Sequence, residues 1–473
     1  MRNTKIVVTL GPATTTEEVI RGLMEAGAEV FRFNASHGTH EEHAERMRLV
    51  RKLAEELGRP AGILLDLQGP KIRLGAFADE GVVLKTGERF TLTTEKVEGN
   101  EQRASVSYAR FAEDVEPGDR VLIADGTVEL RVVSGDGAEA RCEVVRGGWV
   151  GDRKGINLPG VKVSAPALTR KDMADLQFGL REGVDMVALS FVRKRDDVLR
   201  LRLMMDQMEA NLPIIAKIEK PEGWANIDQI LEESDGVMVA RGDLGVEVAL
   251  EKVPTIQKAI IERARAKGRF VITATQMLES MVVSPVPTRA EVSDVANAIE
   301  DGTDAVMLSA ETSTGKYPVE AVRMMARVAA EADGAYQAKG FRQLPMSKSP
   351  NPSEIVADAA YRGASIARPA AIVALTSSGY TARLVARYRP PVPIFVCTPD
   401  AAVVRQLTVV YGIRAEQVER SDSSDDVFNK LDLLLREKAG LKVNDTVIVL
   451  AGLPIAKMGP TNTMKLHRLG EWR

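Results

Sequence analysis

The sequence predicts an α/β protein built on a (β/α)8 TIM barrel, and two patterns carry this prediction. Eight short apolar runs rich in Val and Ile recur, and such runs are typical of strands buried on both faces of a parallel sheet. Longer segments with helical signals lie between them, as expected where strands and helices alternate around a barrel. A doubly wound open sheet is the alternative, and the count of eight weighs against it. The expected strands span residues 4–10, 28–34, 61–67, 186–191, 213–219, 236–243, 269–276 and 305–311.

The helices expected between these strands carry start and stop signals. The segment 14–27 has acidic residues early and a glycine at its end. In 168–183, Thr169 stands three residues before Asp172, which is the spacing of a capping box. The segment 288–302 repeats that pattern, so we expect an amphipathic helix in each of the three.

The alternation of strands and helices is interrupted by a segment of about 100 residues that follows the third strand. They contain short β-like runs separated by Gly, Asp and Pro turns. We therefore expect a small all-β domain, residues 70–164, inserted into a barrel made of residues 1–69 and 165–340. Because it follows the carboxyl end of a barrel strand, it would lie over the barrel mouth as a lid.

The last part of the chain predicts a separate domain. Residues 337–354 are rich in Pro, Ser and Lys and indicate a boundary. Beyond them a strand, a Ser/Thr/Gly turn, a helix and further strands follow, so residues 345–473 predict a C-terminal α/β domain.

The composition excludes several classes of protein. A formal net charge of −3 argues against nucleic-acid binding through a broad basic surface. The only two cysteines, Cys142 and Cys397, are far apart in sequence, which argues against a disulfide framework and fits a reducing cytoplasm. The N-terminal apolar run, residues 6–10, is too short for a signal peptide, and no segment is long enough to span a membrane. We expect a cytoplasmic protein.

Polar residues gather at the expected carboxyl ends of the barrel strands, where barrel enzymes carry their active sites. Lys217 and Glu219 share one face of a strand, with Ile218 on the other. A buried structural ion pair is one interpretation of this pair; the other makes Glu219 and Asp243 ligands of Mg²⁺. Every strand but the first contributes such a group: Arg32, Asn34, Ser36, Asp66, Ser190, Lys217, Glu219, Arg241, Asp243, Thr273, Thr275, Ser309 and Glu311.

A set of cations accompanies these carboxylates and favours a phosphorylated substrate, because phosphoryl transfer depends mainly on positioning and charge stabilisation. The set comprises Arg32, Arg73, Lys154, Lys217 and Arg241. Walker and protein-kinase motifs are missing, so a kinase would be of another kind.

Three of the four histidines, His37, His40 and His43, lie three residues apart and raise the alternative of a metal site. Positions on the face of a helix are the commoner interpretation of this spacing, so we expect His40 and His43 to lie on a helix and bind nothing.

Eight motifs, in the order found here, resemble the motif series of the pyruvate kinase family. They are TKIVVTLGPA, RFNASHGTHEEH, DLQGPKIR, KGINLPG, AKIEKPEG, MVARGDLGVE, TATQMLESM and MLSAETSTGKYP. The resemblance runs from Lys5 to the C-terminus. It implies phosphoryl transfer from phosphoenolpyruvate to ADP, giving pyruvate and ATP in the last step of glycolysis. It also implies Mg²⁺ as cofactor, with Mn²⁺ as a substitute, and a homotetramer.

The resemblance assigns roles by position in these motifs. Lys217 would stabilise charge on the phosphoryl group in flight, and Arg32 would bind that group. Glu219 and Asp243 would hold Mg²⁺. Ser190, Gly242, Asp243 and Thr275 would contact the substrate, with Thr275 catalytic near the carbon that is protonated. The nucleotide would meet Asn34, His37, Arg73 and Lys154.

One departure concerns the monovalent cation. Family members that need K⁺ typically carry Thr after the aspartate and Glu four residues beyond that Thr, whereas this chain has Leu67 and Lys71. It thus resembles the K⁺-independent branch, with the Lys71 ammonium replacing the ion. The other family K⁺ ligands are retained and leave a monovalent site open as an alternative: Asn34, Ser36 and Asp66.

The segment TSSGYT, residues 376–381, follows an expected strand and opens a helix. Its amides and hydroxyls could cradle a phosphate, or the turn could merely cap the helix. The family binds phosphorylated effectors on this loop, which implies activation by a sugar phosphate or a nucleotide monophosphate. The matching residues are Thr376, Ser377, Ser378, Gly379 and Thr381.

Two other functions stay open. One is a Mg²⁺-dependent lyase acting on a 2-oxo acid enolate with the same Lys, Glu and Asp. The other is a non-catalytic sugar-phosphate sensor built around the C-terminal domain. The β insertion and its Lys154 argue against the lyase, and the complete set of Lys217, Glu219, Asp243 and Thr275 argues against the sensor.

Overall fold

A closed barrel of eight parallel strands forms the centre of the protein, which confirms the predicted fold class. The computed structural model describes residues 2–339, 344–347, 349–420, 423–454 and 459–471. Around the barrel the order is β1-β17-β16-β15-β14-β13-β3-β2, and every neighbouring pair is parallel. All eight predicted strands are present: β1 (Lys5–Thr9), β2 (Val30–Asn34), β3 (Gly62–Asp66), β13 (Met186–Leu189), β14 (Ile214–Ile218), β15 (Gly236–Ala240), β16 (Phe270–Ala274) and β17 (Ala305–Leu308).

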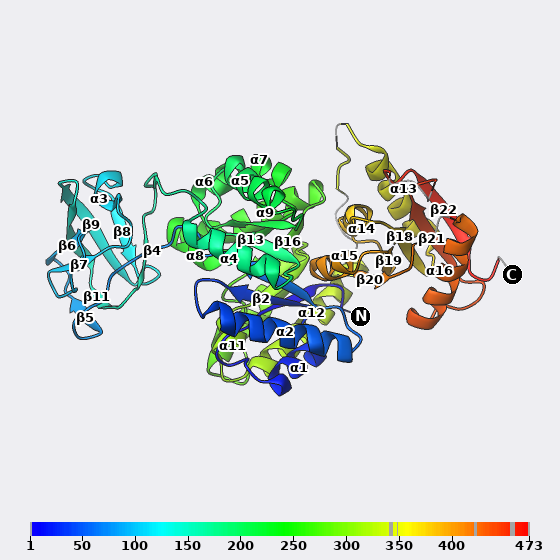
Figure 1. Cartoon of the computed structure of the whole chain (residues 1–473), viewed down its shortest axis with the longest axis horizontal. Helices are drawn as coiled ribbons and strands as arrows, with labels where there is room; N and C mark the ends of the chain where they lie inside the picture. The colour runs from blue at the N-terminus through cyan, green and yellow to red at the C-terminus, as the bar shows by residue number, and fades with distance from the viewer. Residues whose placement is uncertain (1, 340–343, 348, 421–422, 455–458, 472–473) are drawn as a thin grey trace.

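Helices surround the barrel and bury its outer apolar face (Figure 1). The predicted capping box is present, because Thr169 Oγ1 accepts from Asp172 N and the Asp172 carboxylate accepts from Thr169 N. The barrel-domain helices are α1 (Glu17–Ala26), α2 (His40–Glu56), α4 (Arg170–Arg181), α5 (Arg195–Gln207), α6 (Pro221–Ala225), α7 (Ile227–Glu233), α8 (Arg241–Glu247), α9 (Val253–Ala266), α10 (Arg289–Glu300), α11 (Ala310–Ser313) and α12 (Pro318–Lys339). Within the described part of the chain, none of the helices combines the length and the hydropathy of a membrane span.

The segment between β3 and β13 forms a separate β structure with its own apolar core, which we call the insert (residues 72–157). It stands to one side of the barrel, joined to it by two passages of chain (Figure 1). A seven-stranded sheet and a two-stranded sheet make it up. Its elements are β4 (Ile72–Arg73), β5 (Gly81–Leu84), β6 (Arg89–Thr93), β7 (Arg103–Ser105), α3 (Phe111–Asp114), β8 (Arg120–Ile123), β9 (Val128–Gly135), β10 (Glu139–Arg146), β11 (Gly148–Gly151) and β12 (Gly155–Asn157).

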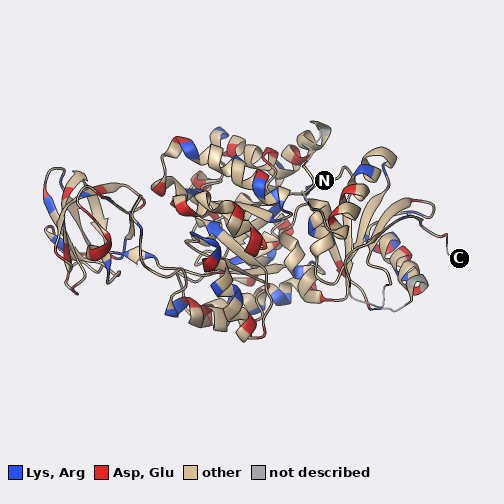
Figure 2. Ribbon diagram, turned by 90° about the horizontal axis from the view of Figure 1, so that it is seen from above, with Lys and Arg blue, Asp and Glu red and all other residues tan. Residues whose placement is uncertain are grey.

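The C-terminal domain lies on the side of the barrel opposite the insert and holds a five-stranded sheet (Figure 1). The helix α12 continues to Lys339, so helical structure extends into the predicted boundary at 337–354, part of which lies outside the described residues. Figure 2 shows basic and acidic residues interspersed along the chain. The elements are α13 (Pro352–Ala367), β18 (Ala371–Leu375), α14 (Tyr380–Ala386), β19 (Ile394–Thr398), α15 (Ala401–Gln406), β20 (Ile413–Gln417), α16 (Ser424–Lys438), β21 (Thr446–Ala451) and β22 (Thr463–Arg468).

Buried ion pairs join the C-terminal domain to the barrel at the amino ends of the strands. Arg389, 2% exposed, donates to Asp304 Oδ1 at 2.9 Å and to the Gly302 carbonyl at 2.7 Å. The same carboxylate accepts from the backbone N–H groups of Val271 and Tyr411. One aspartate therefore fixes the starts of two barrel strands and the approach of the second domain.

Replacing Arg389 should destabilise the protein strongly. In Arg389→Met the Asp304 carboxylate stays buried without its cation, which costs about 3–5 kcal/mol. Urea denaturation measures the loss. The matched control is Arg362→Met, because Arg362 pairs with Asp358 while 62% exposed, and such surface pairs contribute less than about 1 kcal/mol. Equal losses in both variants would contradict the assigned role of Arg389.

Candidate active site

A buried cluster of alternating charges lies at the carboxyl ends of four neighbouring strands, β2, β3, β13 and β14. Its centre is Lys217, whose Nζ lies 2.9 Å from Glu219 Oε1 and 3.3 Å from Asp66 Oδ1 and donates to Ser190 Oγ at 2.8 Å. Burial lowers the pKa of Lys217, but the charges of Asp66 and Glu219 outweigh it and raise the pKa above its ordinary value. The ammonium therefore stays charged inside the barrel mouth.

Arg32 forms the second cationic arm of this cluster. Its Nε and Nη2 each lie 2.7 Å from Asp66 Oδ2, and its Nη1 donates to Thr9 Oγ1 at 2.9 Å. Burial raises the pKa of Asp66, but Lys217 and Arg32 outweigh it, so the pKa is lowered. Thr9 ends β1, so the expectation that the first strand contributes no polar group was wrong. A lone threonine at a strand end gave no signal beyond β-propensity.

Glu219 is held in place by the backbone that follows β13. Its Oε2 accepts from Phe191 N at 2.7 Å, and Phe191 has φ +56°, a strained conformation for an aromatic residue. Ser190 fixes the preceding position, since its hydroxyl donates to the Leu67 carbonyl at 2.7 Å. Strain of this kind persists only where the surroundings enforce it, and it is concentrated at functional sites.

Thr275 is strained as well. It has φ +70°, and Gln276 after it has φ +54°. The Thr275 hydroxyl accepts from Gly242 N at 2.8 Å and donates to the Ala274 carbonyl at 2.7 Å. A left-handed β-branched residue is a true outlier, so the turn holds this hydroxyl in place at an energetic cost.

Two polar strand-end residues differ from the expectation. Arg241 does not join the cationic set, because its guanidinium donates to Asp294 at 2.7 Å and to the Thr275 carbonyl at 2.8 Å. It holds the strained turn instead. Thr273 bonds to Thr303 inside the barrel wall and is not part of the mouth.

Glu219 and Asp243 have the chemistry of a Mg²⁺ site. Glu219 is 1% exposed; burial raises its pKa, and the charge of Asp243 raises it further against the opposing effect of Lys217. Two carboxylates that destabilise each other are relieved by a divalent cation, and Mg²⁺ prefers one or two carboxylates with substrate oxygens and water. The described residues contain no group of three or more His, Cys, Asp or Glu that could hold a metal by themselves. The pair therefore fits a metal that shares its ligands with a substrate.

The β2–α2 loop lines one side of this cluster. Asn34 pairs in register with Asp66, and its Oδ1 accepts from Ser36 N at 3.1 Å. The pKa of His37 is lowered by burial and by the charges of Arg73, Lys71 and Arg32, so its ring is neutral at pH 7.

His40 and His43 lie on α2, as expected, but both have partners. The His40 Nε2 lies 2.8 Å from Asp175 Oδ1, and the His43 Nε2 lies 2.8 Å from the His37 carbonyl. The pKa of His43 is lowered by burial, so the neutral ring donates to this carbonyl and fixes the loop. Both rings are thus held by contacts within the chain.

The insert contributes two more cations. Arg73 Nη1 donates to the Arg153 carbonyl at 3.3 Å, and Lys154 Nζ lies 5.3 Å from the centre of the Trp149 ring. Lys71 lies on the outgoing passage and lines a small cavity between insert and barrel. It makes no ion pair with Asp66 within the described chain; Arg32 and Lys217 take that place.

Comparison with known proteins gives one consistent answer. The family model for the pyruvate kinase barrel domain matches residues 1–322, and that for the pyruvate kinase alpha/beta domain matches residues 354–467. The pyruvate kinase of Mycobacterium tuberculosis is 46% identical over 471 residues, with 99% of each chain covered. That of Staphylococcus epidermidis is 43% identical over 479 residues, covering 100% of this chain and 81% of that protein.

A solved structure agrees with these relatives. The crystal structure of a pyruvate kinase from Cryptosporidium parvum superposes with a TM-score of 0.91 at 36% sequence identity, covering 99% of this chain and 96% of that one. The family models together span both the barrel and the C-terminal domain. This chain belongs to the pyruvate kinase family of phosphotransferases.

Proposed function

We propose that this protein transfers the phosphoryl group of phosphoenolpyruvate to ADP at the mouth of its barrel. The observation that carries the proposal is the buried Lys217 between two carboxylates, with a second cation, Arg32, beside it. Phosphoryl transfer needs fixed positive charge around the group in flight more than it needs covalent chemistry. The family membership supports phosphoenolpyruvate and ADP as substrates.

In this mechanism each residue has a separate task. Arg32 and Lys217 bind the phosphoryl group and stabilise the charge that its oxygens carry during transfer. The strained turn presents the Thr275 hydroxyl near the carbon that is protonated, and the Gly242 backbone orients the substrate. Ser190 holds Lys217 in place. When bound, Mg²⁺ on Glu219 and Asp243 supplies charge that draws the substrate oxygens together.

The nucleotide approaches from the insert. Asn34 and the neutral His37 lie on the barrel side, while Arg73 and Lys154 face it from the insert. Closing a lid of residues 70–164, which contains the insert, would bring these cations to the phosphates of ADP and exclude water, which competes as acceptor. The barrel domain is then residues 1–69 and 165–340, and the C-terminal regulatory domain residues 345–473.

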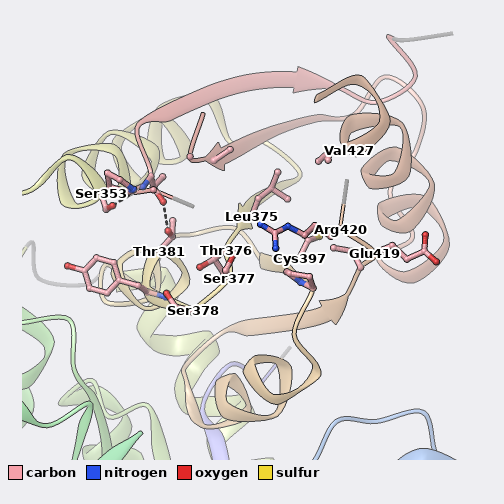
Figure 3. A pocket seen from close by; sticks show the side chains of 18 residues that line it. Ser353, Leu375, Thr376, Ser377, Ser378, Thr381, Cys397, Glu419, Arg420 and Val427 are labelled. Atoms are coloured by element: carbon pink, nitrogen blue, oxygen red, sulfur yellow. Dashed lines mark hydrogen bonds between the residues drawn. The ribbon is translucent and has the colours of Figure 1, made fainter. Parts of the chain in front are cut away.

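The C-terminal domain offers an effector site. A cavity of about 330 Å³ is lined by the loop that carries Thr376, Ser377 and Ser378. Figure 3 shows the Arg420 side chain reaching toward Thr376 and Ser377 from the opposite wall. Hydroxyls on one side and a guanidinium on the other suit a phosphate monoester. We assign the cavity to a sugar phosphate or nucleotide monophosphate that activates the enzyme, with Gly379 and Thr381 completing the loop.

Turnover without K⁺ is part of the proposal. The Asp66 carboxylate, which would otherwise face an ion together with Asn34 and Ser36, is already balanced by Arg32 and Lys217. Lys71 lies on the passage that moves when the insert closes, so its ammonium would approach this side of the site.

A homotetramer is supported by exposed apolar side chains on the C-terminal domain. The edge strand β22 exposes Met464 at 37% and Leu466 at 57%, and α13 exposes Ile366 at 85%. An edge strand with apolar side chains is protected by pairing with another copy.

One assay separates this function from the lyase and the sensor. Pyruvate formed from phosphoenolpyruvate is measured with and without ADP, first with Mg²⁺ and then with EDTA. The proposal expects pyruvate and ATP in equal amounts, only with ADP and only with the metal. Pyruvate formed without ADP would favour the lyase, and no pyruvate under any condition would favour the sensor.

Replacing Lys217 tests its role directly. Lys217→Met removes the charge that meets the transferring group, so turnover should fall by on the order of 10²-fold or more. Lys252→Met is the control, because Lys252 is exposed and makes no ion pair with the cluster among the described residues. Near-normal turnover in Lys217→Met would refute the assigned role.

Adding KCl to a K⁺-free assay should leave turnover unchanged within its error. Lys71→Glu should reduce turnover and make it respond to KCl, because a carboxylate recreates the need for an ion. Lys162→Glu, the same change at an exposed position of the returning passage, should do neither. Strong activation of the unmodified protein by KCl would sink the prediction.

A panel of sugar monophosphates and nucleoside monophosphates tests the effector site. At least one should lower the phosphoenolpyruvate concentration that gives half-maximal rate, whereas its unphosphorylated parent should not. Ser378→Asp should abolish the shift by charge repulsion without changing the rate in the absence of effector. A panel in which no compound shifts the curve would contradict the assignment.

A further inference from the structure

One buried carboxylate, Glu247, contacts both the root of the insert and the barrel. Its side chain is 1% exposed, and its Oε1 accepts from Asn157 Nδ2 at 2.9 Å and from Lys220 Nζ at 2.5 Å. Asn157 is the last residue of β12 in the insert, and Lys220 follows Glu219 directly. Glu247 thus joins the insert to the strand end that carries a candidate metal ligand.

The same short helix carries both this contact and the site. Glu247 ends α8, and the first turn of α8 contains Gly242 and Asp243. Gly126 of the insert also lies near this helix, close enough that a Cβ added to it would be 3.8 Å from Val246 Cγ1. The contact with the insert and Asp243 therefore lie about one turn apart on the same helix.

On the insert side of the contact, Asn157 lies close to the two insert cations, Arg73 and Lys154. Lys154 precedes Asn157 by three residues, and Gly155 pairs in register with Arg73. The pairing of Asn157 with Leu122 ties this strand to the main sheet of the insert. Both insert cations therefore lie close to the strand that ends at the Asn157–Glu247 contact.

We propose that Glu247 and Asn157 are positioning residues that fix the pivot of the insert and thereby set Arg73 and Lys154 against the nucleotide phosphates. This inference rests on the proposed function. Its physical basis is the buried carboxylate: Glu247 Oε2 has no hydrogen-bond partner among the described residues, so loss of the remaining contacts would leave the charge buried and unpaired. The pivot is therefore stiff, and a misplacement of about 1 Å at a site can reduce turnover by about 10²-fold.

The test uses three variants of the full-length protein. Asn157→Asp places a carboxylate against Glu247 and should open the contact. The double variant N157D/E247Q exchanges donor and acceptor and should restore it. Asn100→Asp makes the same chemical change within the insert, at a residue whose Oδ1 only accepts from Gln102 N and Arg103 N, and serves as the control.

Steady-state kinetics and hydrogen exchange then decide the proposal. N157D should raise the KM for ADP and lower kcat, each by on the order of 10-fold, while the KM for phosphoenolpyruvate stays near its original value. N157D/E247Q should recover most of both losses, and N100D should lose nothing. Unchanged ADP kinetics in N157D, equal losses for both substrates, or no recovery in the double variant would each overturn the proposal.

Amide hydrogen exchange of the two passages, residues 67–74 and 155–165, gives a readout without substrate. N157D should exchange faster there, and the double variant should return to the original rate. If the unmodified protein formed no pyruvate, the proposed function would fail, yet these exchange rates would still decide whether Glu247 fixes the pivot. Exchange in N157D equal to the unmodified protein would reject it.

Discussion

The site depends on one buried interaction, the Lys217 ammonium held between Asp66 and Glu219. Charges so far from water are tolerated only when paired, and here the pairing comes from neighbouring strands. The barrel order sets β2, β3, β13 and β14 side by side, so their carboxyl ends deliver a cation, an anion, a hydroxyl and a cation in sequence. The closed parallel sheet thus brings opposite charges together and offsets the cost of burying them.

Positive and negative charges are not paired equally at every residue of the cluster, and this difference determines which ligands the cluster favours. Asp66 has two cations, whereas Glu219 shares Lys217 with Asp66 and is repelled by the charge of Asp243. The carboxylate pair favours a divalent cation, and the cations favour a phosphate. Strained backbone at Phe191 and Thr275 supports this arrangement. The Phe191 amide donates to Glu219, and the Thr275 hydroxyl accepts from the Gly242 amide. The strain lowers the stability of the fold, and in return these two polar groups are held in fixed positions.

Much of this arrangement followed from the sequence. Period-2 alternation placed Lys217 and Glu219 on one face, and eight apolar runs gave all eight barrel strands. The partner of Arg241, Asp294, lies 53 residues away, and no local pattern connects them. Glu247 and Asn157 could not be connected from the sequence for the same reason, since their contact joins residues 90 positions apart, one in the insert and one in the barrel. In the C-terminal domain, β20 and β22 carry no clear strand signal in the sequence, because their mixed polar and apolar residues lack the continuous apolar run of a buried strand.

The central claim is that the Glu219 and Asp243 carboxylates form one metal site beside the Lys217 cluster. Titration of the substrate-free protein with Mn²⁺, followed by electron paramagnetic resonance of the free ion, measures this directly. The account predicts one site per chain that weakens by more than about 10-fold in both Glu219→Gln and Asp243→Asn, with Asp196→Asn, at an exposed position, unaffected. Unchanged Mn²⁺ affinity in both carboxylate variants would contradict it.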